Sequence, residues 1–239
     1  MRLTILGMNG PFPAPHSACS GYLVESGSTT LQMDIGTGTL SALTGWTAPE
    51  KLDALLLSHW HFDHCSDLLP LIFRLQACAQ RPLELYAPAD EASAIRKIAL
   101  GSEVFHVHTV APGDSFTVGD IQCTVFNARH PVPAVMYRLT DGTSTLAFTG
   151  DTNTQSELPA LAEHADLLLA DGLFPVAAWA EGKPHLSARQ CAELARDAQV
   201  KQLVITHLNP QFDPETLLRE AREVYPTVTL AACGKRYEL

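Results

Sequence analysis

The stretch from His59 to His64, with the sequence HWHFDH, constrains what this chain can fold into more than any other. It directly follows the apolar run Leu55-Leu56-Leu57-Ser58, which is typical of a short buried strand. Alternate side chains of an extended backbone share a face, so His59, His61 and Asp63 can converge. His64 then points elsewhere, as a ligand for a second ion would. Because imidazoles and carboxylates bind zinc and similar ions, the stretch predicts a metal-binding loop rather than a polar surface loop rich in histidine.

The composition places the chain among globular proteins. We expect one domain over residues 1–239, because 46% hydrophobic and 18% charged residues are ordinary for a soluble domain with a full core. No stretch approaches the roughly 20 apolar residues of a membrane span, and residues 1–7 show no signal peptide. The six cysteines are scattered without a CxxC pair, which favours reduced thiols and a cytoplasmic protein.

The charge of the chain restricts its partners. A formal net charge of -10, without a cluster of lysine and arginine, argues against a broad surface for nucleic acid. A small anionic substrate could still be drawn to bound cations in one cleft. We therefore expect a small-molecule substrate and no membrane partner, while a homodimer stays open because no interface can be read from the sequence.

The pattern of expected elements changes along the chain. In the first part we expect helices at 39–44, 68–79 and 91–100, with strands at 2–6, 21–25, 29–33, 52–57, 83–86, 104–110, 115–118, 121–126, 134–139 and 145–148. From residue 157 helices at 157–163, 188–198 and 214–224 alternate with strands at 166–170, 202–206 and 227–231. This order predicts an α/β protein with a four-layer α+β arrangement, in which two sheets lie inside and helices cover their outer faces.

Three further candidate ligands follow strand-like runs. His130 comes shortly after the run 121–127, Asp151 after the run 146–150, and His207 after the run 203–206. Ligands at the ends of several strands form a cleft of the kind in which such sheets bind their ligands. Each residue alone could be structural, but together with HWHFDH they predict a dinuclear centre.

At this point the chain resembles the metallo-β-lactamase superfamily. HWHFDH is similar to the HxHxDH motif of that family, and His130, Asp151 in FTGDT and His207 in ITHLN follow in the family's order. The resemblance implies an αβ/βα sandwich of two mixed sheets flanked by helices. It also implies one metal held by His59, His61 and His130, and a second held by Asp63, His64 and His207. Asp151 would bridge the two.

Several segments are similar to the ribonuclease Z and phosphodiesterase branch of this family. They are residues 18–22, 34–38, 130–138 and 185–190, although Met136 stands where the third-histidine motif usually has glycine. The resemblance implies that His185 assists phosphodiester cleavage.

The sequence around His185 supports this role. Ser187 is a good N-cap, which would hold His185 on a loop beside a helix start that attracts anions.

Ribonuclease Z carries a long tRNA-gripping arm between its third histidine and its bridging aspartate. Here only residues 131–150 separate His130 from Asp151, and they are occupied by two strands. We therefore predict that the protein does not mature tRNA.

The predicted function is that of a dinuclear metal-dependent hydrolase. We expect a phosphodiesterase that acts on a small phosphodiester or cyclic phosphate through a metal-bridging hydroxide, with Asp63 and His185 as catalytic residues. Two divalent ions are implied, zinc by preference, with manganese or iron suiting the same donors. The alternative is a carbonyl hydrolase, a lactonase or thioesterase, at the same site. A metal-binding module without turnover is a third interpretation.

Other residues carry weaker expectations. Asp34 either holds the ligand loop or caps a turn, Trp179 belongs either to a lid or to the core, and His16 could line the cleft. His106 and His108 are expected on one solvated face of a strand.

The two aromatic residues within HWHFDH alternate with its ligands. Trp60 and Phe62 are therefore expected to pack under the loop. The neighbouring Cys65 is not expected to be a ligand, since the imidazole and carboxylate set is already complete.

Overall fold

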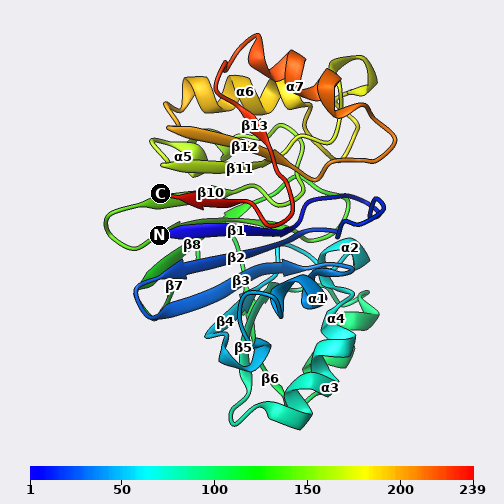
Figure 1. The fold of residues 1–239 in the computed structure, drawn as a ribbon, viewed down its shortest axis with the longest axis vertical. Coiled ribbons are helices and arrows are strands. Elements are labelled where there is room, and N and C mark those ends of the chain that lie inside the picture. Colours follow the sequence, from blue (N-terminus) through cyan, green and yellow to red (C-terminus); the bar gives the residue numbers. More distant parts are fainter.

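Two mixed sheets of seven strands each face one another in the computed structural model, which describes residues 1–239 (Figure 1). The first sheet has the order β14 (Arg236–Glu238), β1 (Arg2–Gly7), β2 (Gly21–Ser26), β3 (Thr29–Ile35), β4 (Ala54–Leu56), β5 (Leu83–Pro88), β6 (Phe105–Val110). The second has the order β13 (Thr229–Leu230), β12 (Gln202–Thr206), β11 (Leu167–Asp171), β10 (Thr145–Phe148), β9 (Val135–Thr140), β8 (Ile121–Asn127), β7 (Ser115–Val118). In each sheet one block of strands is parallel, β3 to β6 and β10 to β13, and the others are antiparallel.

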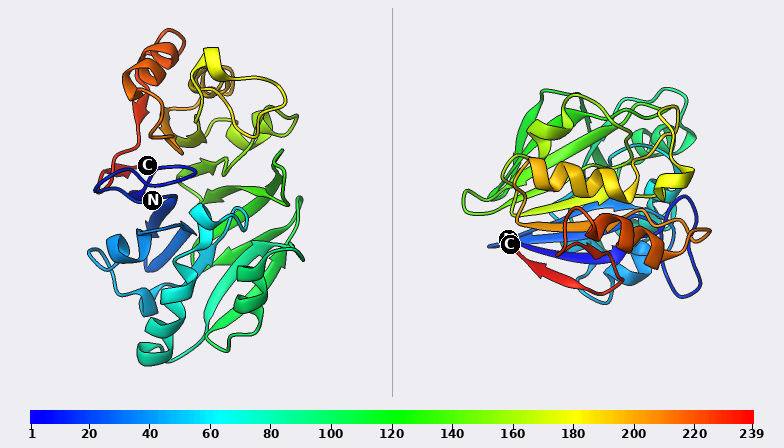
Figure 2. Two further views of the ribbon diagram at one scale, coloured as in Figure 1. Left: turned by 90° about the vertical axis from the view of Figure 1, so that its right-hand side faces the viewer. Right: turned by 90° about the horizontal axis from the view of Figure 1, so that it is seen from above.

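Helices cover the outer faces of both sheets. Figure 1 shows α6 and α7 at one end of the molecule and α3 and α4 at the other, with the strands between them, and the left view of Figure 2 shows the same order from another side. The first sheet carries α1 (Thr39–Leu43), α3 (Leu68–Cys78) and α4 (Ala94–Leu100), and the second carries α5 (Leu158–Ala162), α6 (Ala188–Asp197) and α7 (Pro214–Arg222). The predicted four-layer α/β sandwich is therefore confirmed. None of these helices combines the length and the apolar character of a membrane span.

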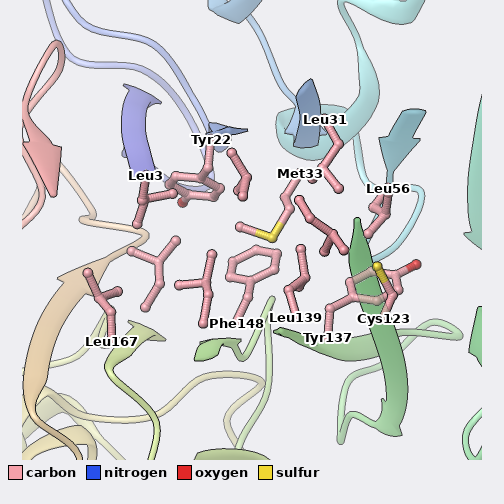
Figure 3. Packing of buried hydrophobic residues seen from close by; sticks show 14 of the residues in the cluster. Leu3, Tyr22, Leu31, Met33, Leu56, Cys123, Tyr137, Leu139, Phe148 and Leu167 are labelled. Carbon is pink, nitrogen blue, oxygen red and sulfur yellow. The ribbon is translucent and has the colours of Figure 1, made fainter. Parts of the chain in front are cut away.

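The central core fills the space between the sheets. Tyr22 and Met33 from the first sheet meet Phe148 and Leu139 from the second, as Figure 3 shows. The rings of Tyr22 and Phe148 pack edge to face with centroids 5.2 Å apart, and burying a side chain of this size contributes roughly 1.5–3 kcal/mol. Two further clusters lie under the outer helices, so both faces of each sheet are apolar.

Two local predictions need correction, and one strand was not predicted. Residues 62–65 form a short helix, α2 (Phe62–Cys65), instead of continuing the extended loop. Helix α4 begins at Ala94 rather than residue 91, because the Ser93 hydroxyl accepts a hydrogen bond from the Arg96 amide and caps the helix there. The strand β14 was not predicted, since Arg236–Glu238 is short and pairs only with β1, at the opposite end of the sequence.

The arrangement of the strands brings distant loops together. The segments after β4, β8, β10 and β12 each carry one or more of the predicted ligands, and β11 ends in a further carboxylate, Asp171. Both sheets therefore contribute donors to a single centre.

Candidate metal centre

The first group of donors joins His59, His61 and His130 to Asp151. Nδ1 of His61 lies 3.0 Å from Nε2 of His59 and 3.1 Å from Nε2 of His130. Asp151 Oδ2 lies 3.6 Å from Nε2 of His59 and 4.0 Å from Nε2 of His130. One atom from each of the four residues lies within 4.8 Å of all the others, so the group could hold one metal ion.

The second group joins Asp63, His64 and His207 to the other oxygen of Asp151. Asp151 Oδ1 lies 3.2 Å from Nε2 of His64 and 3.4 Å from Nε2 of His207. Asp63 Oδ2 lies 3.5 Å and 3.2 Å from the same two nitrogens. All four side chains are buried, and their donor atoms again lie within 4.8 Å of one another.

Hydrogen bonding alone does not satisfy this arrangement. Asp151 Oδ1 and His207 Nδ1 are buried without a hydrogen-bond partner, which is unusual for polar atoms in a protein interior. Nε2 of His64 faces Nε2 of His207 at 3.3 Å. A divalent cation in the second group would engage Asp151 Oδ1 and the Nε2 atoms of His64 and His207, while His207 Nδ1 faces Asp171 Oδ1 at 3.5 Å. The other oxygen of Asp151 is directed to the first group. The residues present therefore fit a pair of ions.

The short helix α2 explains how one loop can serve both groups. The helical turn at Phe62–Cys65 rotates Asp63 away from His59 and His61 and towards His207. The prediction from extended backbone that these three side chains converge is therefore wrong for Asp63. Cys65 donates its thiol to the Trp60 carbonyl at 3.4 Å and is buried, which agrees with its expected non-ligand role.

Of the two aromatic residues in the loop, Trp60 is buried and Phe62 is exposed. Trp60 is buried and donates its indole N–H to the Pro88 carbonyl at 2.7 Å. Phe62, which was also expected under the loop, is 69% exposed, because the first residue of α2 lies on the outer side of the helix.

Asp34 fixes the position of the ligand loop through hydrogen bonds to Ser58 and His64. Its Oδ1 accepts from the Ser58 amide at 2.7 Å, and its Oδ2 accepts from the Ser58 hydroxyl at 2.9 Å. Nδ1 of His64 lies 2.8 Å from the same Oδ2 and donates to it, which leaves Nε2 of His64 directed towards Asp151. Of the two interpretations considered for Asp34, orientation of the ligand loop is thus the one that the geometry supports.

We expect Asp34→Asn to weaken metal binding by about 10- to 100-fold, the usual cost of losing a carboxylate that orients a ligand histidine. The amide replaces one acceptor oxygen with a donor, so it cannot accept from both the Ser58 amide and His64. Competition with a chromophoric chelator measures the affinity. An unchanged dissociation constant would contradict the orienting role.

Asp171 is a residue of the candidate site that the sequence did not predict. Nδ1 of His185 donates to Asp171 Oδ2 at 2.7 Å, and the ring centroid of His185 lies 4.8 Å from that of His207 and 5.5 Å from that of His130. The available signal was the strand run LLLAD, which ends in a carboxylate in the same way that LAFTGD leads to Asp151. Asp171 thus holds His185 beside both donor groups.

The loop that bears His185 is held by two further side chains. Trp179 donates its indole N–H to the His185 carbonyl at 3.1 Å. Asn153 donates to the carbonyls of Ala180, Glu181 and Lys183. Trp179 therefore belongs neither to the core nor to a free lid, and instead ties this loop in place. Ser187 caps α6 as predicted, in a capping box with Gln190.

The pKa values of the histidines are shifted in opposite directions in the two groups. Burial lowers the pKa of His59 well below its usual value and lowers the pKa of His130 to about 4. Burial opposes protonation of His64 and His207 as well, but the surrounding carboxylates together outweigh it, with Asp151 the strongest of them. They raise the pKa of His64 well above its usual range and that of His207 to about 10. Metal uptake by the second group therefore has to release protons.

The loop between β1 and β2 packs closely against His207 at Gly10. A Cβ atom added to Gly10 would lie 1.8 Å from Nε2 of His207. Gly10 donates its amide to the Leu208 carbonyl at 3.3 Å, which fixes the loop at this distance. His16, in the same loop, is exposed and belongs to neither donor group.

Gly10→Ala is expected to displace the His207 ring and to weaken metal binding in the second group by about 10- to 100-fold, as other losses of ligand orientation do. Zinc content after dialysis against a weak chelator measures this effect. Gly182→Ala is a suitable control, because a Cβ atom there meets nothing within 4 Å. Equal zinc content in the two variants would contradict the prediction.

Fold, donor geometry and sequence now define the class of protein. A sequence model described as a beta-lactamase superfamily domain matches residues 36–208. The chain belongs to the metallo-β-lactamase superfamily, near its ribonuclease Z-like branch, and is a metal-dependent hydrolase.

Relatives and solved structures agree with this placement. The chain is 32% identical over 247 residues to the probable metallo-hydrolase YhfI of Bacillus subtilis, with both chains fully covered. The crystal structure of YhfI superposes with a TM-score of 0.93 and covers 100% of this chain and 99% of that one. Ribonuclease Z of Methanopyrus kandleri is 30% identical over 269 residues, covering 97% of this chain and 95% of the relative. A diphosphatase of the PhnP family shares the fold, with a TM-score of 0.79 at 19% identity, covering 100% of this chain and 98% of that one.

Proposed function

We propose that this hydrolase is a phosphodiesterase that acts on a small phosphodiester or cyclic phosphate. Its ions would be two divalent metals, by preference zinc, held by His59, His61 and His130 on one side and by Asp63, His64 and His207 on the other, with Asp151 between them. The observation that carries the proposal is the position of His185, whose Nδ1 is fixed by Asp171 at 2.7 Å and lies 3.8 Å from Asp151 Oδ2. Residues 1–239 would form a single catalytic domain.

When bound, a pair of divalent ions supplies Lewis acidity and activates water for attack near neutral pH. The protein supplies the remaining steps. Asp63 lies between the two donor nitrogens of its group and is placed to orient the attacking water. His185 donates from Nε2 to the leaving oxygen, while its Nδ1–H stays bonded to Asp171 and keeps the ring in place. This division of roles suits a phosphodiester, because the leaving alkoxide needs a proton.

The short connection between His130 and Asp151 favours a small substrate. The residues between them form β9, β10 and their turns, so no arm extends there to grip a large RNA. The net charge of -10 also disfavours a polyanion. A ribonuclease Z relative at 30% identity makes tRNA processing the competing activity, and the proposal is that this chain does not perform it.

Parallel assays of one zinc-loaded preparation test the proposal. We expect bis(p-nitrophenyl) phosphate and small cyclic phosphates to be hydrolysed, with loss of activity on chelation and recovery on adding zinc. A panel of lactones and thioesters is assayed alongside, together with a tRNA precursor carrying a 3′ trailer. Faster turnover of a lactone or thioester, or trailer removal at ordinary enzyme concentrations, would contradict the proposal.

A further inference from the structure

Away from the candidate metal centre, two neighbouring strands bring two imidazoles and a carboxylate together. Glu84 on β5 is paired in register with His106 on β6, and His108 follows two positions later on the same face. Glu84 Oε2 lies 3.2 Å from Nδ1 of His106 and 2.5 Å from Nε2 of His108. One donor atom of each residue lies within 4.8 Å of the other two. The three side chains therefore have the spacing of a tridentate ligand set.

A stack of aromatic rings holds this cluster in place. The His108 ring lies flat against Tyr86, with centroids 4.5 Å apart and an interplanar angle of 13°. Tyr86 in turn stacks on Phe116 of the second sheet at 4.0 Å and 2°. Tyr86 and Phe116 both pack against the central core. The His108 imidazole is thus fixed by packing before any ligand arrives, which reduces the entropy lost on binding.

We propose that Glu84, His106 and His108 form a further metal site, for a transition-metal dication such as Zn²⁺, on the β5–β6 edge of the first sheet. Two neutral imidazoles and one carboxylate are a donor set that Zn²⁺ accepts.

The position of the site predicts its character. The side chains of His106 and His108 are 64% and 34% exposed, so solvent can complete the coordination sphere and the ion can exchange. The strands β5 and β6 lie at the end of the molecule opposite α6 and α7 (Figure 1). None of the three residues belongs to the donor groups around Asp151. The site is therefore independent of the proposed phosphodiesterase activity.

A bound ion would join the edge strand β6 to β5, and through His108 and Tyr86 to the second sheet. A ligand that binds only the folded state raises its stability by mass action. We therefore expect micromolar zinc to raise the melting temperature beyond the value reached when the Asp151 centre is filled.

Zinc stoichiometry tests the site. The full-length protein and its variants are dialysed against micromolar free Zn²⁺, and the zinc bound per chain is measured by elemental analysis. We expect His106→Ala and Glu84→Gln each to bind one zinc ion fewer per chain than the unaltered protein, and to lose the additional rise in melting temperature. His164→Asn removes an exposed histidine elsewhere at a positive φ that asparagine tolerates, and should bind as the unaltered protein does.

Two results would overturn the assignment. One is the same zinc content in the unaltered protein, His106→Ala and Glu84→Gln. The other is loss of an equal amount of zinc from His164→Asn. Hydrolytic activity serves only as a check that the variants retain the Asp151 centre. The zinc bound per chain can therefore be interpreted even if the phosphodiesterase proposal fails.

Discussion

Replacing His185 with alanine is expected to lower the turnover of a phosphodiester by about 100- to 10,000-fold, the range of a lost general acid. The imidazole is held by Asp171 and lies against the rings of His207 and His130, but it is not needed to complete either donor group. The variant should therefore keep both of its ions. The loss should appear in kcat, because the proton is transferred in the transition state.

Two measurements on the same preparation decide this prediction. Elemental analysis gives the metal content per chain, and steady-state kinetics with a small cyclic phosphate, whose leaving alkoxide needs a proton, gives kcat and KM. His16→Asn is a matched control, since His16 is an exposed histidine at positive φ that belongs to neither donor group. Loss of metal from His185→Ala, or turnover equal to that of the control, would remove His185 from the catalytic step.

The second large effect is expected for Asp151→Asn. Asp151 is buried, with Oδ2 directed to His59 and Oδ1 directed to His64 and His207. An amide keeps the size of the side chain but removes its charge and turns one acceptor into a donor. The protein should then bind fewer ions per chain. Its activity should fall by more than about 100-fold, because a catalytic ion contributes several kcal/mol and each 1.36 kcal/mol is worth a factor of ten.

Zinc content and activity of this variant are compared with those of Asp114→Asn. Asp114 is a surface carboxylate that accepts a hydrogen bond from Ala111 within its own turn, and an amide oxygen can accept the same bond. If Asp151→Asn retained the metal content of the control, the bridging position of Asp151 would be wrong.

The donors of the site could be predicted from the sequence because they follow strand-like runs. His130, Asp151 and His207 each follow an apolar run, and the structure brings all three to the HWHFDH loop. The four-layer architecture could be predicted as well, since alternating and continuous apolar runs identify strands and periodic ones identify helices. These patterns lie within short stretches of sequence, and the same stretches form the predicted elements in the structure.

What could not be predicted depends on contacts between distant segments. The turn at α2 decides which group Asp63 joins, and a four-residue helix leaves no periodicity in the sequence. Asp171 acquires its role only because His185 returns to the end of β11 across a long loop. His106 and His108 gain a partner only when β6 pairs with β5 and places Glu84 beside them.

The central claim is that two ions lie on either side of Asp151, with substrate phosphate between them and His185. A crystal structure of the zinc-loaded protein with inorganic phosphate, using anomalous scattering to locate the metal, tests it most directly. We predict two zinc ions about 3.5–4 Å apart, one bound by His59, His61 and His130, the other by Asp63, His64 and His207, and a phosphate oxygen within hydrogen-bond distance of His185. A single ion, or a phosphate bound away from His185, would contradict it.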